Sequence, residues 1–153
     1  MRVSIKNQNM ENKIILLSIH PKYAKKISDG TKRIEIRRVK PKYLNPTSIV
    51  ILYVTSPEKK IMGAFRVKEI INKAPDELWK DVHETAGISY NDFNDYLQGV
   101  AVAVGIRFTE YWCSDQELTL KTIRDKITNF VTPQGFRYLT IEESLFFKSM
   151  KLI

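Results

Sequence analysis

The stretch Gly30-Thr31-Lys32-Arg33-Ile34-Glu35-Ile36-Arg37-Arg38 decides how the first part of the chain folds. Its glycine follows a short amphipathic segment, and a glycine at that place commonly ends a helix. Apolar and charged residues then alternate, which predicts a strand over residues 33–39. The two isoleucines share one face of this strand, and the glutamate shares the other face with the arginines on either side of it. The sequence therefore places one carboxylate between two guanidinium groups.

The residues before this stretch predict a helix over residues 21–29. Pro21 suits the first helical position, and Tyr23, Ala24 and Ile27 form an apolar side. His20 precedes the helix and is not a favoured capping residue, so we expect a poor N-cap. The free backbone N–H groups of the first turn predict a place for an anion near His20 and Lys22.

The rest of the chain predicts an α+β fold. Residues 48–56 are apolar on both faces, as in a central strand. Gly63 predicts a bulge or a close approach of another backbone. We expect further strands over residues 14–19, 61–71 and 100–112. We expect further helices over residues 75–85, 89–97, 116–126 and from 140 onward, and an irregular segment over residues 129–139. About five strands flanked by helices indicate a small mixed β-barrel, with residues 1–12 as a flexible arm and residues 13–153 as one domain.

Composition excludes several classes of protein. The chain has 153 residues, enough for one domain with a sizeable core. Cys113 is the only cysteine, which excludes an internal disulfide and suits a reducing compartment. With only His20 and His83 as histidines, we expect no metal site and no cofactor. No apolar run is long enough to span a membrane, and we expect a cytoplasmic protein.

Charge is unevenly distributed along the chain, whose formal net charge is +8. The segment from His20 to Lys42 holds nine cations against Asp29 and Glu35. The segment from Asp76 to Asp95 is acidic. This pattern predicts an electrical dipole with one basic side, which would attract phosphate backbones. The alternative is a solvated basic surface with no ligand.

Glu35 and its neighbours are the main chemical candidates, and each has two interpretations. Glu35 either makes a surface ion pair with Arg33 or Arg37, or is an ionised carboxylate that accepts protons from a ligand or water. The guanidinium groups of Arg37 and Arg38 suit phosphates or base edges. His20 is either an acid or base or a structural residue at a strand end. Aromatic residues near the basic segment either stack on bases or belong to the core.

Four segments together resemble the ASCH domain of the PUA-like superfamily. They are Ser18-Ile19-His20-Pro21-Lys22-Tyr23-Ala24, the G-x-K-x-x-E-x-R pattern of residues 30–37, Tyr53-Val54-Thr55-Ser56-Pro57 with Gly63-Ala64-Phe65-Arg66-Val67, and Pro133-Gln134-Gly135-Phe136-Arg137-Tyr138-Leu139. The resemblance implies a PUA-like barrel with a cleft between the first helix and the barrel, where RNA or a nucleotide binds. Some small relatives resemble amidohydrolases of acetylated cytidine that use a lysine, a threonine and a glutamate. Lys32 matches the lysine, Glu35 stands at the threonine position, and Glu69 is a candidate for the glutamate.

We therefore expect an RNA- or nucleotide-binding protein, with the opening stretch as the floor of a basic cleft. The alternatives are a hydrolase of a modified nucleoside, a ribonuclease for single-stranded RNA and, less favoured, a regulatory module that meets an acidic protein. If the protein is an enzyme, Lys32 and Glu35 are the catalytic candidates, provided that Lys32 precedes the regular strand. The expected ligand-binding residues are His20, Lys22, Lys32, Arg37, Arg38, Ser56, Gln134, Arg137 and Tyr138.

Overall fold

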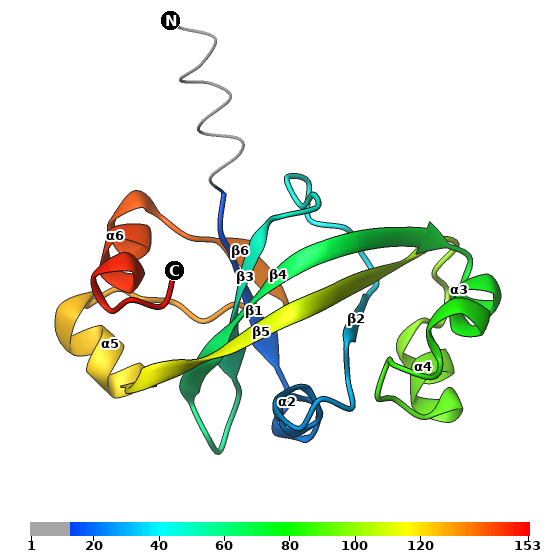
Figure 1. The fold of residues 1–153 in the computed structure, drawn as a ribbon, viewed down its shortest axis with the longest axis horizontal. Helices are drawn as coiled ribbons and strands as arrows, with labels where there is room; N and C mark the ends of the chain where they lie inside the picture. The colour runs from blue at the N-terminus through cyan, green and yellow to red at the C-terminus, as the bar shows by residue number, and fades with distance from the viewer. Residues whose placement is uncertain (1–12) are drawn as a thin grey trace, which may run out of the picture.

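The computed structural model describes residues 13–153, so the expected arm over residues 1–12 lies outside the described residues. Strands and helices are interspersed along the chain (Figure 1). The strands are β1 (Ile15–Ile19), β2 (Ile34–Arg37), β3 (Ile49–Val54), β4 (Lys60–Lys73), β5 (Ala103–Thr119) and β6 (Phe136–Tyr138). The helices are α2 (Pro21–Ser28), α3 (Pro75–Val82), α4 (Tyr90–Tyr96), α5 (Leu120–Lys126) and α6 (Ile141–Ser149).

The six strands form one sheet in the order β2-β5-β4-β3-β1-β6. Strands β1 and β3 are parallel, and the other neighbouring pairs are antiparallel. The sheet curls into a half-barrel with helices around it (Figure 1). The expected α+β class and mixed barrel are confirmed. The strands number six instead of about five, because residues 136–138 of the segment expected to be irregular pair with β1.

Strand β5 is longer than its sequence indicates. We expected a helix over residues 116–126, but the strand continues to Thr119 and α5 begins at Leu120. The pairing of β5 with β4 reaches Lys60↔Thr119 and Ile61↔Leu118. These cross-strand contacts outweigh the weak helical preference of residues 116–119, since pairing and packing commonly override propensity.

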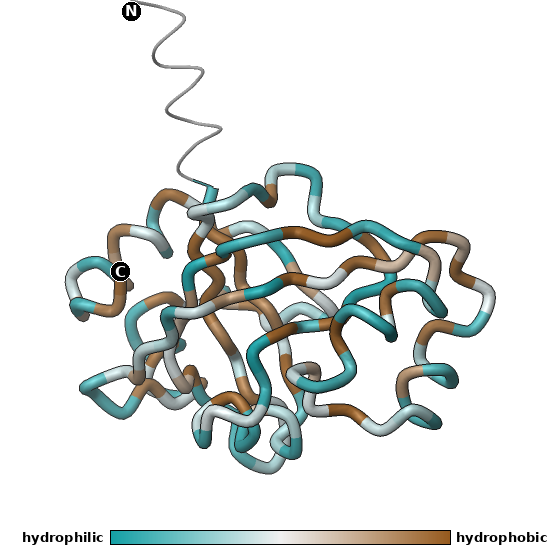
Figure 2. The backbone as a smooth tube through the Cα atoms, turned by 45° about the vertical axis from the view of Figure 1, so that its right-hand side comes forward, coloured by the Kyte–Doolittle hydropathy of each residue, from teal (hydrophilic) through white to brown (hydrophobic). Residues whose placement is uncertain are grey.

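Apolar side chains lie on both faces of the central strands. In Figure 2 their hydrophobic residues are the brown stretches of the backbone tube inside the molecule. The inner face packs against Ala24 and Ile27 of α2. The outer face of β1 and β3 packs under α5 and α6 through Ile123 and Phe147. A third cluster joins β2 to α3 and α4. Burial on both faces explains why β3 reads as a continuous apolar run.

The expectation for Gly63 is confirmed. The register of β4 against β5 shifts between Ile61 and Gly63. A Cβ atom at position 63 would lie 2.1 Å from the carbonyl oxygen of Trp112, which is too close for any side chain. The glycine is therefore needed to let the two strands approach.

Candidate functional site

Helix α2 begins with a side-chain cap that its sequence did not indicate. The Nδ1 atom of His20 accepts a hydrogen bond from the backbone N–H of Lys22 at 3.0 Å. The expectation of a poor N-cap was therefore wrong, because an imidazole nitrogen can replace the usual oxygen acceptor. This bond also places the proton of a neutral His20 on Nε2. His20 is exposed, so Nε2 can donate to a ligand.

A tight turn connects α2 to β2 and aims Lys32 inward. Gly30 has a φ of 85°, a conformation that glycine adopts without a steric penalty. Asp29 Oδ1 accepts a bond from the N–H of Thr31 at 2.8 Å, and the N–H of Lys32 donates to Lys26 O at 2.9 Å. Lys32 thus precedes β2, which begins at Ile34. Because Lys32 lies before the regular strand, its side chain can point to the same side as that of Glu35.

Lys32 and Glu35 form a buried ion pair. Lys32 Nζ lies 3.7 Å from Glu35 Oε1, and the two side chains are 2% and 9% exposed. Glu35 Oε1 also accepts a bond from the backbone N–H of Ile36 at 3.0 Å. Because β2 is an edge strand, this amide is free to bond a side chain instead of a neighbouring strand. The carboxylate therefore meets Lys32, and the described contacts include no ion pair between Glu35 and Arg33 or Arg37.

The lysine is also held by a loop far away in sequence. Lys32 Nζ donates to Ala86 O at 2.7 Å. A Cβ atom at Gly87 would lie 2.8 Å from Lys32 Cβ, so only glycine fits there. No local pattern predicts this contact, because 54 residues separate the two partners. The 86–87 loop and the pair are thus packed as one unit.

Burial changes the acid–base properties of this centre. Burial is the main cause that lowers the pKa of Lys32, and the charge of Glu35 offsets it only in part. The Tyr23 ring centre lies 5.4 Å from Lys32 Nζ. Burial also raises the pKa of Tyr23, with a smaller contribution from Asp92 and Glu35. A lysine with a lowered pKa is neutral more often and can accept a proton.

Arg37 connects this centre to the loop before β6. A Cβ atom at Gly135 would lie 3.1 Å from Nη2 of Arg37. Buried Ser18 fixes that loop: its Oγ donates to Pro133 O at 2.6 Å, and its N–H donates to Gly135 O at 2.9 Å. No role was predicted for Ser18. Through Arg37 the structure joins β2 to this loop, on which Gln134 is exposed.

Other candidate residues lie elsewhere or have other partners. Arg38 Nη1 donates to Tyr96 O at 2.6 Å and to Gln98 O at 3.1 Å, at the end of α4 and just after it. The hydroxyl of Tyr138 accepts the N–H of Tyr43 at 2.8 Å. Ser56 is exposed in the turn after β3. None of these three has a described contact with the Lys32–Glu35 pair.

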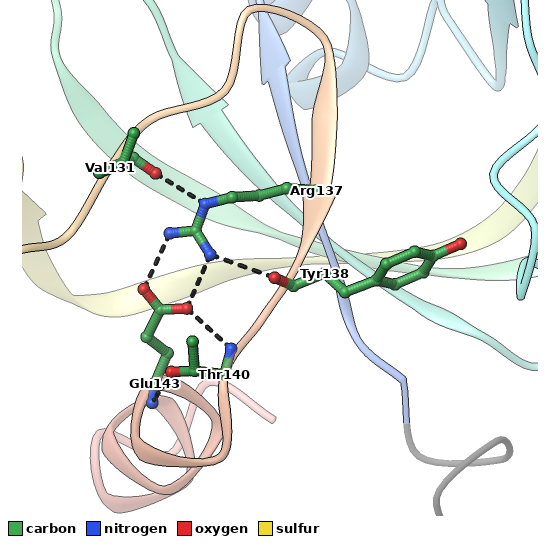
Figure 3. A network of polar contacts seen from close by, with 5 residues as sticks. All are labelled: Val131, Arg137, Tyr138, Thr140 and Glu143. Atoms are coloured by element: carbon green, nitrogen blue, oxygen red, sulfur yellow. Dashed lines mark hydrogen bonds and ion pairs between the residues drawn. The ribbon is translucent and has the colours of Figure 1, made fainter.

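Arg137 is part of a separate network (Figure 3). Its guanidinium group donates to both carboxylate oxygens of Glu143, at 2.7 and 2.8 Å, and to the carbonyls of Val131 and Tyr138. Glu143 also accepts the N–H of Thr140 at 2.8 Å in a complete capping box. These contacts use the donors that would hold a ligand, so the expectation of Arg137 as a ligand-binding residue is not supported by its position.

The acidic and basic segments are in contact, so acidic residues border part of the expected basic side. Lys22 Nζ lies 3.5 Å from Asp92 Oδ2, and both side chains are about half exposed. Arg38 reaches the end of the same acidic helix, α4. Packing of α3 and α4 against β2 brings the two charges together, since their apolar faces share one cluster.

A cavity of about 740 Å³ lies between α2 and the barrel, as expected, but the opening stretch does not line it. Its walls come from the other side of α2 and from β3, β4 and β5. Lys22, Lys25 and Lys60 are matched there by Glu58, Asp115 and Glu117, so the cavity is not basic. The expected floor of the cleft, Lys32 and Glu35, belongs to the opposite side of the helix.

Residues 13–153 contain neither a candidate metal site nor a candidate membrane-spanning helix. No group of three or more histidine, cysteine, aspartate or glutamate side chains in this range could hold a metal ion. No helix in the same range is long and apolar enough to cross a membrane.

Glu69, the candidate for a third amidohydrolase residue, pairs with Arg107 at 3.1 Å on the β4–β5 surface.

Comparisons with known proteins identify the family. The ASCH domain-containing ribonuclease of Zymomonas mobilis is 27% identical over 134 residues, which are 88% of this chain and 89% of that protein. A crystal structure of ASCH from Zymomonas mobilis has a TM-score of 0.82 at 25% identity, covering 90% and 95% of the two chains. The large ribosomal subunit protein uL22 of Ureaplasma parvum is 26% identical over 82% of this chain but only 39% of its own length. The model of the ASCH domain family matches residues 17–120. The chain belongs to the ASCH domain family.

Proposed function

We propose that this protein binds single-stranded RNA beside α2 and β2 and cleaves it, with the Lys32–Glu35 pair as its chemical centre. The observation that carries the proposal is the burial of this pair next to Tyr23. An ion pair with 2% and 9% exposed side chains is costly to bury, and buried groups with a shifted pKa cluster at functional sites. The ribonuclease of Zymomonas mobilis, similar over most of both chains, supports RNA as the substrate.

The groups around the pair suit a phosphodiester. Arg37 presents a guanidinium fork beside Gly135, and His20 presents Nε2–H at the start of α2. Tyr23, whose ring lies 6.4 Å from the His20 ring, supplies a surface for stacking. These residues would hold the phosphate and one base, while the 133–135 loop forms the opposite wall.

In the proposed reaction, neutral Lys32 takes the proton of a ribose 2′-hydroxyl. The 2′-oxygen attacks the adjacent phosphorus, the bond to the 5′-oxygen breaks, and the leaving oxygen takes a proton from water. The products are a 2′,3′-cyclic phosphate and a 5′-hydroxyl end. Arg37 stabilises the charge that develops on the phosphate oxygens. Glu35 orients the lysine and, by its charge, limits how far the pKa of Lys32 falls.

A second candidate function is RNA or nucleotide binding without cleavage. The observation in its favour is that only 2% of the Lys32 side chain is exposed, so a substrate reaches Nζ only if a group that covers it moves. In this case Arg37, His20 and Lys22 hold the ligand, and Lys32 supports the site from beneath. Deacetylation of a nucleoside receives less support, because Glu69 is engaged with Arg107 and Glu35 replaces the expected threonine.

The test compares wild-type protein with Lys32→Met and Lys121→Met on end-labelled single-stranded RNA. Lys121 is an exposed lysine of α5 and provides the matched control. We expect Lys32→Met to lower the cleavage rate at least about 100-fold, the typical contribution of a general base, and Lys121→Met to leave it unchanged. Binding, followed by anisotropy, should weaken steeply with salt.

Each alternative result is decisive. Salt-dependent binding by a wild-type protein that never cleaves would replace the ribonuclease by the binding module. Cleavage that survives Lys32→Met would remove the lysine from the chemistry. A wild-type protein that neither binds nor cleaves RNA would exclude both functions.

A further inference from the structure

Helix α6 is apolar on two opposite sides. Phe147 faces the core and is fully buried. Ile141 and Leu145, four residues apart and therefore on one helix face, are 81% and 61% exposed. Two large aliphatic side chains that are exposed side by side and border a groove indicate an interaction site, because contiguous apolar surface commonly marks one.

Such a groove lies beside α6. It has a volume of about 640 Å³ and runs between α6 and the starts of β1 and β3. Its aliphatic residues are Ile14, Ile49, Leu139, Ile141, Leu145 and Ile153. Its charged residues are Lys13, Arg66 and Lys148. The described lining includes no acidic side chain and no aromatic ring, which sets it apart from the charge-balanced cavity beside α2.

We propose that this groove binds an acidic amphipathic helix of a partner protein. The aliphatic lining matches leucine-like side chains at i, i+3, i+4 and i+7 of such a helix. The three cations match carboxylates on its polar side. Arg66 Nη1 donates to Thr47 O at 3.1 Å, and the pair of Arg66 with Glu110 is 3.6 Å long and on exposed side chains. Because such an exposed pair is weak, Arg66 can exchange Glu110 for a carboxylate of the partner.

Three other occupants fit less well. Single-stranded RNA would bring phosphates, but the groove offers its bases no aromatic ring. A second copy packed about a twofold axis would bring the same patch, with its Lys13, Arg66 and Lys148, to both sides of the contact, and like charges repel. Residues 1–12 precede Lys13 in the groove wall, but their Arg2 and Lys6 outnumber Glu11, so their charge opposes the groove.

The experiment selects ligands from a phage-displayed library of helical peptides and measures synthetic copies by fluorescence anisotropy. We expect enrichment of peptides with net negative charge and aliphatic residues at helical spacing. Leu145→Glu should weaken binding about tenfold or more, since a central apolar contact is lost and a like charge is added. Lys148→Glu should weaken it several-fold.

Matched controls place the same changes outside the groove. Val102→Glu adds a charge at another exposed apolar residue, and Lys121→Glu reverses a charge on α5. Both should leave peptide affinity unchanged, and circular dichroism should show that each variant is folded. RNA binding and cleavage should be unaffected by Leu145→Glu, so this test does not depend on the proposed function.

Several results would overturn the proposal. Enrichment of basic peptides, of none, or of peptides that bind Leu145→Glu as well as wild type would exclude an acidic helix. Sedimentation that reveals a dimer broken by Leu145→Glu would assign the groove to a second copy. Loss of RNA binding in Leu145→Glu or Lys148→Glu would make the groove part of the RNA surface.

Discussion

Within residues 13–153, the partly buried pair Arg137–Glu143 and the buried pair Lys32–Glu35 differ in how completely they are bonded. Arg137 and Glu143 share two hydrogen bonds of 2.7 and 2.8 Å, and the further donors and acceptors of both are used by backbone groups (Figure 3). Lys32 and Glu35 lie 3.7 Å apart and each has one backbone partner. The first pair connects β6 to α6, and the second lies beside the proposed RNA site.

The difference shows which pair serves the fold. Burial alone would raise the pKa of Glu143, but hydrogen bonds from Arg137 and Thr140 outweigh it and leave that pKa below its ordinary value. In the other pair burial prevails, and the pKa of Lys32 is lowered. Full compensation of a buried charge is expected of a structural network, whereas incomplete compensation keeps a group able to change its protonation state.

The largest stability effect should come from replacing the fully bonded pair. We expect Arg137→Met with Glu143→Leu to lower the free energy of unfolding by about 3 kcal/mol, because the capping box and the carbonyls of Val131 and Tyr138 lose their partners. Urea denaturation measures this loss. A double variant as stable as wild type would show that the network contributes no stability.

Replacing the incompletely bonded pair should cost less. We expect Lys32→Met with Glu35→Leu to stay within about 1 kcal/mol of wild type, since an apolar pair often replaces a buried ion pair without loss. RNA binding or cleavage should nevertheless fall, while Lys32→Met alone, which leaves a buried carboxylate, should be less stable than the double variant. Urea denaturation and the RNA assays separate these outcomes; a double variant that fails to fold would contradict the comparison.

Stability as a function of pH distinguishes the Glu143 carboxylate from a neutral amide. Because the folded pKa of Glu143 is lowered, its contribution is present above the ordinary value of 4.5 and is lost as the pH falls through the folded pKa. We therefore expect the stability difference between wild type and Glu143→Gln to shrink with acidification below that value. Urea midpoints from neutral to acidic pH measure it, and a constant difference would be inconsistent with the shift.

The smallest effect concerns the proton of Lys32. Its folded pKa is lowered, so between that pKa and the ordinary 10.5 the unfolded chain binds the extra proton and stability rises with pH. Glu35→Gln removes a charge that raises the pKa of Lys32, and the pKa should fall further. NMR titration of the lysine side-chain carbon beside Nζ measures the change. An unchanged or higher pKa would show that the two groups are not coupled.

Much of the fold could be predicted from the sequence because its signals are local. The Gly30 helix stop, the alternation of Ile34 and Ile36, and the apolar run of β3 each depend on neighbouring residues. Strand β6 and the end of β5 could not be predicted, because each forms through pairing with a distant strand. The cap at His20 was missed because residue-type preferences do not anticipate an imidazole acceptor.

The sequence by itself determined the α+β class, the family, and the residues Lys32, Glu35 and Arg37 as chemical candidates. Only the tertiary structure decided their partners: Glu35 meets Lys32 instead of an arginine, Arg137 meets Glu143, and Lys22 meets Asp92. The physical reason is that side-chain direction along a strand follows from local geometry. The partner of each charged side chain depends on how the 86–87 loop, α4 and α6 pack against the sheet. These packing contacts join residues that are far apart in the chain.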